Sequence, residues 1–320
     1  MKVLITGGLG YLGGRISQHL SAETVRILAR KNGQRIPEWA DKYEIVEGDV
    51  LDDDSLLRAC KGTDVIVHLA ALNEIDSGKY PFKAMQVNAE GTLRLLQAAS
   101  ACGVERFIYF STFHVYGSNA HGRITEETVT APYHPYAISH HAAEDFVRMM
   151  VKKGNISGAV LRLSNGFGYP SHPEVNRWTL AFNDFCLQAV LNNRIILKTS
   201  GKQHRDFVTL TDVSRCAEHF IANKKMFSSG NFIYNLGGKC SISIRDAAEL
   251  VADRYEKFAG SKPDIVIESN SIQQSDERVD YSIEKLEKTG YSLSSNINEE
   301  IDKTILFCKE NMEVLRCRLK

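Results

Sequence analysis

Three glycines near the start of the chain, Gly7, Gly10 and Gly13, have the spacing of a phosphate cradle. They follow an apolar run at residues 3–5 and precede a helical pattern, so the chain turns between a buried strand and a helix. Glycine lets the backbone approach a pyrophosphate, and the start of the helix offers unpaired N–H groups. A flexible loop is the alternative, but it explains neither Thr6 nor the apolar flank. The pattern therefore predicts a dinucleotide site.

A further strand-like run, residues 64–69, ends at the small residues Ala70 and Ala71. Small side chains at the carboxyl end of a parallel strand let a flat ring lie against the backbone, and open α/β sheets bind ligands at that edge. His68 stands inside this run and could act as a base. Its apolar neighbours favour a hydrogen-bonded core histidine instead.

The composition excludes several classes of function. Lys plus Arg equals Asp plus Glu at 39 each, so no overall field attracts nucleic acid. No apolar stretch approaches the roughly 20 residues of a membrane helix, and the N-terminus enters a strand directly, so we expect a cytoplasmic protein without a membrane partner. The seven cysteines are scattered without C-x-x-C spacing, so we expect reduced thiols and no metal site.

Short apolar runs alternate with helical patterns along the first half of the chain. The runs stand at residues 3–5, 25–28, 43–46, 64–69, 106–110 and 159–163. This alternation predicts an α/β fold with a doubly wound parallel sheet, the Rossmann arrangement, because right-handed crossovers place helices on both faces of the strands. We assign residues 1–165 to this NAD(P)-binding unit.

The alternation loosens after Asn165, where a second region begins. Strand-like runs at 206–210 and 232–238 indicate that the chain returns to the first unit near residues 205–248. We therefore expect a smaller substrate-binding domain over residues 166–320 that is interleaved with the first.

Several motifs occur in an order that points to one family. After the cradle at residues 6–13 come HLAA at 68–71, VNAEGT at 87–92, FSTFHVYG at 110–117, YAISHHAAE at 136–144 and LRLSNGFG at 161–168. Together they resemble the extended short-chain dehydrogenase/reductase family, whose members mostly act on nucleotide-activated sugars. The likeness runs from Met1 to about Tyr291. It implies an NAD(P)-dependent enzyme, a nucleotide-diphosphate sugar as substrate, and a homodimer joined through the helices after Asn88 and Tyr136.

The resemblance assigns catalytic roles to Thr112, Tyr136 and His140. Tyr136 matches the family tyrosine that exchanges a proton with the substrate, and Thr112 matches the hydroxyl that bonds the reacting oxygen. A phenol with a pKa near ~10 needs nearby positive charge to accept a proton at neutral pH. The family places a lysine four residues after the tyrosine, where this chain has His140. His140 could bond the nicotinamide ribose, assist Tyr136 as a cation, or be a surface histidine beside His141.

The resemblance also implies a set of cofactor-binding residues. Asp49 matches the aspartate that receives the adenine amino group, and Asn88 matches an asparagine that supports the active-site strand and helix. Arg30 and Lys31 stand where an NAD-preferring member carries an acid, and two cations suit a 2′-phosphate. NADP is therefore favoured, NAD stays open, and a solvated basic turn is the alternative. The full set is Gly7, Gly10, Tyr11, Leu12, Gly13, Arg30, Lys31, Asp49, Val50, Leu69, Ala70, Ala71, Asn88, Tyr136 and His140.

On the substrate side, the resemblance implies contacts from Asn165, Arg205 and Arg278 near the phosphates. Two arginines suit a diphosphate because each guanidinium bonds phosphate oxygens in two places. Thr112 and His114 follow the fifth apolar run and are expected to reach the sugar; a structural role is the alternative for His114.

Two reactions fit these residues. The sequence Thr-Phe-His at 112–114 departs from the Thr-Asp-Glu pattern of the family's sugar 4,6-dehydratases, so elimination of water is disfavoured. Reduction of a 4-keto nucleotide sugar and epimerisation remain, and the basic pair at 30–31 slightly favours reduction. A nucleotide-binding sensor or scaffold that lost its chemistry with the lysine is the alternative from another class.

Overall fold

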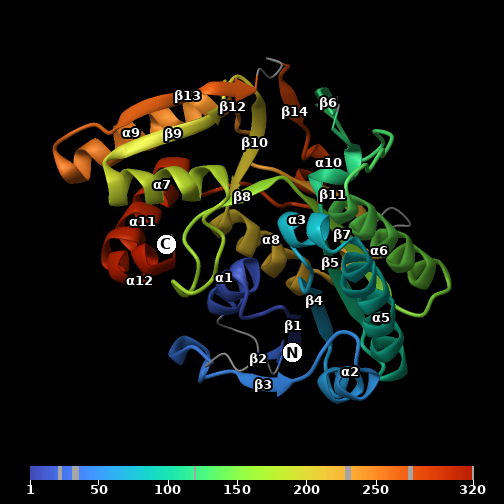
Figure 1. The fold of residues 1–320 in the computed structure, drawn as a ribbon. Helices are drawn as coiled ribbons and strands as arrows, with labels where there is room; N and C mark the ends of the chain where they lie inside the picture. Colours follow the sequence, from blue (N-terminus) through green and yellow to red (C-terminus); the bar gives the residue numbers. More distant parts are fainter. Residues whose placement is uncertain (21–23, 31–35, 119, 228–231, 273–276, 319–320) are drawn as a thin grey trace.

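The computed structural model describes residues 1–20, 24–30, 36–118, 120–227, 232–272 and 277–318. Its centre is a seven-stranded parallel sheet in the order β11, β7, β5, β4, β1, β2 and β3 (Figure 1). The predicted α/β fold with a doubly wound parallel sheet is confirmed, and each apolar run in the first half of the chain contributes to one strand. In sheet order the strands span Ile233–Leu236, Ser157–Leu163, Arg106–Thr112, Val65–His68, Lys2–Thr6, Thr24–Ala29 and Glu44–Glu47.

Helices cover both faces of this sheet. On one face lie α1 and α8, and on the other α2, α5 and α6, which span Tyr11–His19, Leu210–Ala222, Asp53–Cys60, Gly91–Ala101 and Pro135–Lys152. Successive strand residues point to opposite faces. Val3 and Ile5 therefore pack in the apolar core that contains α1 and α8, whereas Leu4 packs in the core of the other three helices.

Between β4 and α5 the chain forms two short helices and one π-helical turn. These elements are α3, α4 and η2, spanning Glu74–Lys79, Pro81–Ala84 and Met85–Glu90. A π-helical turn inserts an extra residue into the helix and is frequent at functional sites. The side chain of Asn88, within this turn, is only 1% exposed.

The second lobe has an apolar core of its own. Helices α7, α9, α11 and α12 and the parallel strand pair β9 and β13 span Ala181–Asn192, Ile244–Ala259, Ile297–Glu310, Met312–Arg318, Arg194–Thr199 and Asp264–Ile272. Phe182, Val251 and Ile305 come from three of these helices and are buried in one cluster. In the described part of either lobe, no helix combines the length and the apolar character required to cross a membrane.

Short strands and turns connect the lobes. The three-stranded sheet of β8, β10 and β12 and the pair β6 and β14 span Asn165–Phe167, His204–Thr209, Ser241–Ser243, Gly122–Ile124 and Val279–Tyr281. Helix α10 and the turns η1, η3 and η4 span Glu284–Glu287, Glu38–Ala40, Phe113–Tyr116 and Lys224–Phe227. In the described ranges, β8 leads from the large sheet towards the second lobe, and its partner strand β10 leads from the second lobe back to α8 (Figure 1).

The chain passes between the two lobes more than once. It leaves after β7, returns as α8 and β11, and leaves again to form α9 and β13. Ile283, Leu286 and Tyr291 then return a second time, because they pack in the same apolar core as α1 and α8. This second return lies beyond the expected residues 205–248.

A buried ion pair joins the lobes. Arg15 on α1 places Nη1 2.9 Å from Oε1 of Glu300 on α11, and the two side chains are 9% and 2% exposed. Arg15 also donates to the Tyr169 carbonyl at 3.0 Å and to the Thr211 hydroxyl at 3.1 Å. The attraction between these charges is strong because the surroundings exclude water.

Removing the acid of this pair is expected to destabilise the protein strongly. Glu300→Ala leaves Arg15 buried without its counter-ion, so the free energy of unfolding should fall by about 3–5 kcal/mol. Urea unfolding measures the change. The control is Glu105→Ala, which breaks the exposed pair with Lys224 and should cost about 0–1 kcal/mol. Equal effects of the two substitutions would contradict the interlobe role of Glu300.

Candidate active site

The glycine segment forms a tight turn that a side chain would disrupt. Gly7 has φ +70°, and a Cβ there would lie 3.0 Å from the Ala70 nitrogen. A Cβ on Gly13 would lie 2.2 Å from the Gly7 carbonyl oxygen, so the helix start and the turn touch there. Gly10 precedes the first residue of α1 and has no side chain to cap the N–H groups of that helix. The segment fits a dinucleotide pyrophosphate, which would accept from these N–H groups.

Two further cradle residues have side chains engaged with the protein. The Tyr11 hydroxyl donates to the Gly168 carbonyl at 2.9 Å, and the Asn183 amide donates to that hydroxyl at 2.9 Å. Leu12 is partly buried against the first core. Tyr11 therefore joins α1 to the second lobe, which leaves its backbone as the part that can contribute to the cradle.

His68 is a core histidine, as its apolar surroundings predicted. Its Nδ1 lies 2.6 Å from the Thr6 hydroxyl and its Nε2 2.8 Å from the Thr92 hydroxyl. Burial lowers the pKa of His68 to about 3, so the ring is neutral at neutral pH. Leu69 and Ala70 follow at the sheet edge, where their N–H groups donate to the Thr6 hydroxyl. Ala71, the next residue, is exposed.

The residues expected around the adenosine lie at the ends of β2 and β3. Asp49 follows β3 and accepts a hydrogen bond from the Leu51 N–H at 3.0 Å. Val50 is buried beneath it. Arg30 follows β2 and is exposed, while Lys31 lies outside the described residues.

Asn88 connects the segment after β4 to helix α6. Its amide nitrogen donates to the Ser139 hydroxyl on α6 at 2.9 Å, and its oxygen accepts from the Leu72 N–H at 2.8 Å. Both functional groups of this side chain are thus used by the protein. Asn88 therefore acts as a brace between β4 and α6, and its side chain is not placed as a direct cofactor contact.

Thr112 and Tyr136 meet where β5 ends and α6 begins. The Thr112 hydroxyl approaches the Tyr136 phenol closely enough to lower its pKa slightly. Burial raises the pKa of Tyr136 and the Glu74 carboxylate raises it further, against smaller opposing effects of Arg177 and Thr112. The phenol therefore carries its proton at neutral pH.

His140 lies one helical turn beyond Tyr136 and is only 3% exposed, which excludes the surface alternative. Its ring centroid lies 4.5 Å from that of Tyr136, and its Nδ1 lies 2.7 Å from the Tyr109 hydroxyl. Nε2 is buried and has no hydrogen-bond partner among the described residues. Burial, helped by His114, lowers the pKa of His140 to about 3. The hypothesis of a cationic His140 is therefore corrected, because the ring is neutral at neutral pH.

A buried charge pair holds α6 against the sheet. The Arg162 guanidinium on β7 donates to both carboxylate oxygens of Glu144 on α6, with Nη2 2.7 Å from Oε2 and Nε 3.0 Å from Oε1. Ser111, beside Thr112 on β5, donates to the same carboxylate at 2.5 Å. Glu144 thereby fixes the helix of Tyr136 relative to the strand of Thr112.

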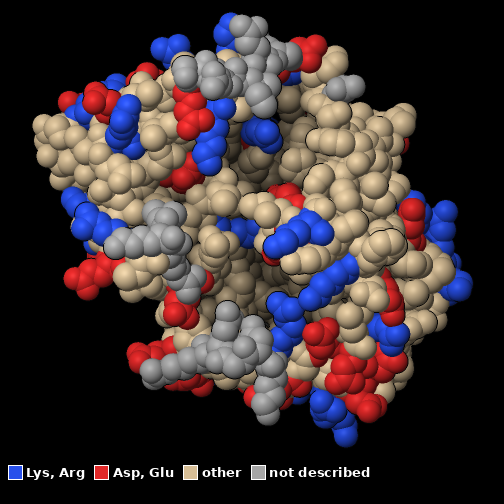
Figure 2. Space-filling model, in the orientation of Figure 1, with Lys and Arg blue, Asp and Glu red and all other residues tan. Residues whose placement is uncertain are grey.

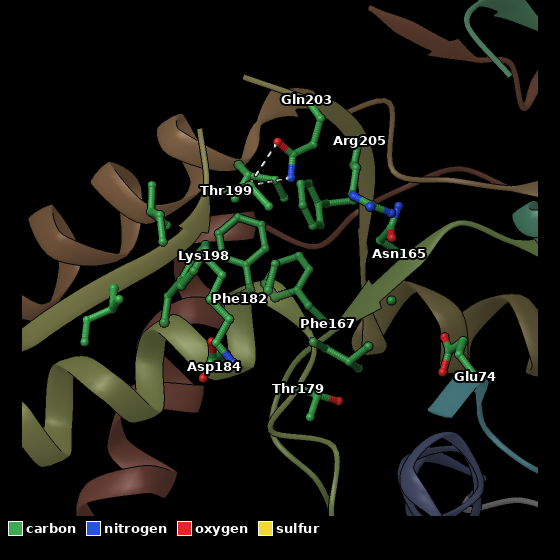
Figure 3. Close-up of a pocket in the computed structure, with 18 of the residues that line it drawn as sticks. Glu74, Asn165, Phe167, Thr179, Phe182, Asp184, Lys198, Thr199, Gln203 and Arg205 are labelled. Carbon is green, nitrogen blue, oxygen red and sulfur yellow. Dashed lines mark hydrogen bonds between the residues drawn. The ribbon is translucent and has the colours of Figure 1, made fainter. Parts of the chain in front are cut away.

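A cavity of about 310 Å³ lies between the lobes and contains Asn165, Arg205 and His114 in its lining. Asn165 and Arg205 lie next to each other on one side of the cavity, and the packed rings of Phe167 and Phe182 lie on another side (Figure 3). The surface is hollowed between the lobes, and Lys and Arg side chains lie along the rim (Figure 2). This cavity has a polar side and an aromatic side.

Two of the three predicted phosphate-binding residues, Asn165 and Arg205, line the cavity, and Arg278 lies elsewhere. Asn165 donates to the Asp206 carbonyl at 2.9 Å, which orients its amide, and burial lowers the pKa of Arg205 without removing its charge. Arg278 is exposed, and its carbonyl accepts from the Gly122 N–H beside β6. Among the described residues that line the cavity, Arg278 does not occur.

Glu74, a carboxylate in the cavity wall, was not among the residues predicted from the sequence. Asn73 caps α3 by accepting from the Asp76 N–H at 2.9 Å, which places Glu74 in the first helical turn. Its Oε2 lies 3.5 Å from Nη1 of Arg177. Nothing in the local pattern distinguishes this acid from other helix-start acids, because the opposite wall comes from distant segments.

Comparison with known proteins decides the family. A profile of the NAD dependent epimerase/dehydratase family matches residues 3–237. The chain belongs to this family. The family comprises NAD-dependent epimerases and dehydratases, and the Rossmann fold of this chain agrees with that of the solved structures similar to it.

Individual relatives match most of the length of this chain. Human dTDP-D-glucose 4,6-dehydratase is 29% identical over 97% of this chain and 90% of its own. UDP-glucose 4-epimerase of Streptomyces lividans is 28% identical over 78% of this chain and 80% of its own. Two solved structures share the fold. They are UDP-glucose 4-epimerase of Thermotoga maritima with UDP-glucose, with 20% identity, TM-score 0.83 and 98% and 100% coverage, and RMD of Pseudomonas aeruginosa with NADPH, with 24% identity, TM-score 0.79 and 97% and 99% coverage.

The buried neutral histidine predicts a pH dependence of stability. Because the pKa of His140 is lowered in the folded protein, the unfolded chain binds a proton at this ring more readily. The stabilisation of the folded state by the neutral ring is therefore complete above pH ~6.5 and is lost as the pH falls towards 3. His140→Gln should therefore reduce the slope of unfolding free energy against pH below 6.5 by up to about 1.4 kcal/mol per pH unit. Urea unfolding at several pH values between 7.5 and 5.5 measures it. An unchanged slope would contradict a neutral buried ring.

Proposed function

We propose that this family member is an NAD(P)-dependent enzyme that transfers hydride at C4 of a nucleotide-diphosphate sugar, with reduction of a 4-keto sugar favoured over epimerisation. The observation that carries the proposal is the close approach of the Thr112 hydroxyl to the Tyr136 phenol at the carboxyl edge of the sheet. A row of neighbouring rings runs from Tyr136 towards the glycine cradle. It consists of His140, Tyr109 and His68 in that order. One edge of the sheet thus holds a proton donor and a dinucleotide cradle.

Tyr136 and Thr112 would act on the same sugar oxygen. A bound nicotinamide supplies the hydride chemistry, and the cradle and the unpartnered His140 nitrogen are the groups that fit it. The raised pKa of Tyr136 suits donation of a proton to an oxygen that gains negative charge. Thr112 would donate to the same oxygen and steady that charge. Proton donation is the direction that 4-keto reduction requires.

The cavity supports a diphosphate sugar as substrate. Arg205 carries a charge that its burial makes costly, and a phosphate would offset that cost. Asn165 stands beside Arg205 (Figure 3), and the aromatic wall of Phe167 and Phe182 can accept a flat base. Arg278 remains a proposed second arginine, which would require a substrate that reaches beyond the cavity.

The residue after Thr112 argues against dehydration. Phe113 packs in an aromatic cluster, with its ring centroid 5.2 Å from Tyr281 and 6.0 Å from Tyr116. It offers no proton to a leaving hydroxyl. The Glu74 carboxylate in the cavity wall lies 3.5 Å from the Arg177 guanidinium, with which it forms an ion pair.

The cofactor and the assembly are parts of the same proposal. Exposed Arg30 at the end of β2 supports NADP through a 2′-phosphate contact, with NAD as the alternative.

A homodimer is the second part of the proposal. We propose that it forms through α5 and α6, which pack side by side on one face of the sheet. Phe146 and Met149 on α6 are partly exposed apolar side chains that such a contact would cover.

One panel of assays separates the candidate functions. The protein is incubated with NADPH, NADH and their oxidised forms, and with UDP- and dTDP-linked hydroxy and keto sugars. We expect consumption of NADPH by a 4-keto sugar. A new sugar isomer without net cofactor change would indicate epimerisation instead. Loss of water from the sugar would contradict the proposal, and cofactor binding without turnover would support the sensor.

Tyr136→Phe should lower turnover by about 10²- to 10⁴-fold, because the phenol proton is lost while the ring remains. NADPH affinity, measured by fluorescence titration, should stay close to that of the unaltered protein. Tyr80→Phe alters a tyrosine that is 49% exposed and serves as the control. Full turnover by Tyr136→Phe would place the proton donor elsewhere.

His114 is expected to contribute to the sugar site. Its ring lines the cavity with its centroid 6.1 Å from that of Tyr136. His114→Asn should lower turnover and leave NADPH affinity unchanged, because the substitution retains a polar group but alters the sugar contact. Steady-state kinetics measure the effect, and unchanged turnover would leave His114 a structural role only.

A further inference from the structure

We propose that Tyr109 is a positioning residue that fixes His140 as the neutral Nε2–H tautomer, so that the ring presents one fixed hydrogen-bond donor in the active site. The tautomer follows from contacts within the protein alone. That the donor serves the nicotinamide ribose rests on the proposed function.

Tyr109 is built into the sheet next to the catalytic helix. It lies on β5, on the same strand as Thr112, and is 3% exposed. Its ring stacks on that of His140 with centroids 5.8 Å apart and an interplanar angle of 28°. Its hydroxyl lies 2.7 Å from Nδ1, and this is its only hydrogen-bond partner among the described residues. His140 Nδ1 is therefore the one described acceptor to which the Tyr109 hydroxyl can donate its proton.

The three protonation states of His140 differ in how many buried donors and acceptors of His140 and Tyr109 they leave without a partner. If Tyr109 donates to Nδ1, Nε2 carries the hydrogen and is the one polar group left without a partner. If Nδ1 carries the hydrogen, the phenol proton and Nε2 are both left without one. A charged ring would leave two donors unpaired and bury a charge as well. Each unpaired buried polar group destabilises the folded protein, so the arrangement with the fewest unpaired groups is favoured.

The neighbouring side chains do not compete for Nε2. His68, which also stacks on Tyr109, has both nitrogens bonded to Thr6 and Thr92. The Tyr136 ring meets His140 at an interplanar angle of 64°, edge to face. Among the described residues, the Nε2–H group is therefore left unpartnered beside Tyr136.

The hydrogen bond from Tyr109 determines what His140 can offer to a molecule bound beside the Tyr136 phenol. Because Tyr109 occupies Nδ1, His140 offers directional bonding without positive charge. Tyr136 then keeps its proton until the substrate oxygen takes it, which matches the proposed reductive direction. Tyr109 acts through His140, so its loss should be visible in the state of that ring even before any ligand binds.

The first test measures the ring nitrogens of the ligand-free protein. Long-range 1H–15N spectra of 15N-labelled protein at pH 7 report which histidine nitrogen is protonated, and His140→Gln assigns the signals. We expect His140 with protonated Nε2 and bare Nδ1. Tyr109→Phe should shift the Nδ1 resonance and admit the other tautomer. Tyr116→Phe is the matched control, because its buried hydroxyl bonds Asn235 at 2.6 Å.

The second test measures cofactor affinity. Tyr109→Phe should weaken NADPH binding by roughly tenfold, since the donor is no longer held in one state, whereas Tyr116→Phe should bind as the unaltered protein does. An Nδ1–H or doubly protonated ring in the unaltered protein, or a spectrum indifferent to Tyr109→Phe, would overturn the positioning role. A shifted tautomer with unchanged NADPH affinity would overturn the ribose assignment alone. Failure of the unaltered protein to bind NADPH or NADH would refute the proposed function, while the spectra would still decide the tautomer.

Discussion

The attachment of α6 to the sheet is the constraint on which the candidate site depends. Glu144 bonds Arg162 on β7 and Ser111 on β5 in surroundings without water, so the helix has one register against the strands. Ionic contacts of this kind are costly to break because either partner alone would be a buried charge. Tyr136 at the start of the helix and Thr112 at the end of the strand are thereby brought within hydrogen-bond reach of each other.

The same attachment buries the position for which the sequence resemblance implied a cation. His140 is covered by the sheet and by Tyr136, and burial keeps it neutral. The Tyr136 phenol is buried as well, and its burial together with the Glu74 carboxylate raises its pKa, so its proton is retained at neutral pH. A site with a protonated phenol, a neutral donor and a charged Arg205 in the cavity suits the delivery of a proton to a phosphate-bearing sugar.

The sequence predicted the sheet well because buried parallel strands are short apolar runs, and it predicted the glycine turn because the spacing has a steric cause. The convergence of Thr112 and Tyr136 followed from motifs in a known order. The state of His140 depends on Tyr109 across the sheet, which no local pattern shows. Glu74 escaped notice because the cavity walls come from distant segments, and Arg278 was expected near the phosphates although β14 pairs with β6 and leaves it exposed.

The most direct test is a crystal structure of the protein with NADP and a nucleotide-diphosphate sugar. The account predicts that the C4 oxygen of the sugar lies within about 3 Å of both the Tyr136 hydroxyl and the Thr112 hydroxyl, with the pyrophosphate of the cofactor on the glycine turn. A sugar whose C4 oxygen contacts neither hydroxyl, or a cofactor bound away from the glycines, would contradict it.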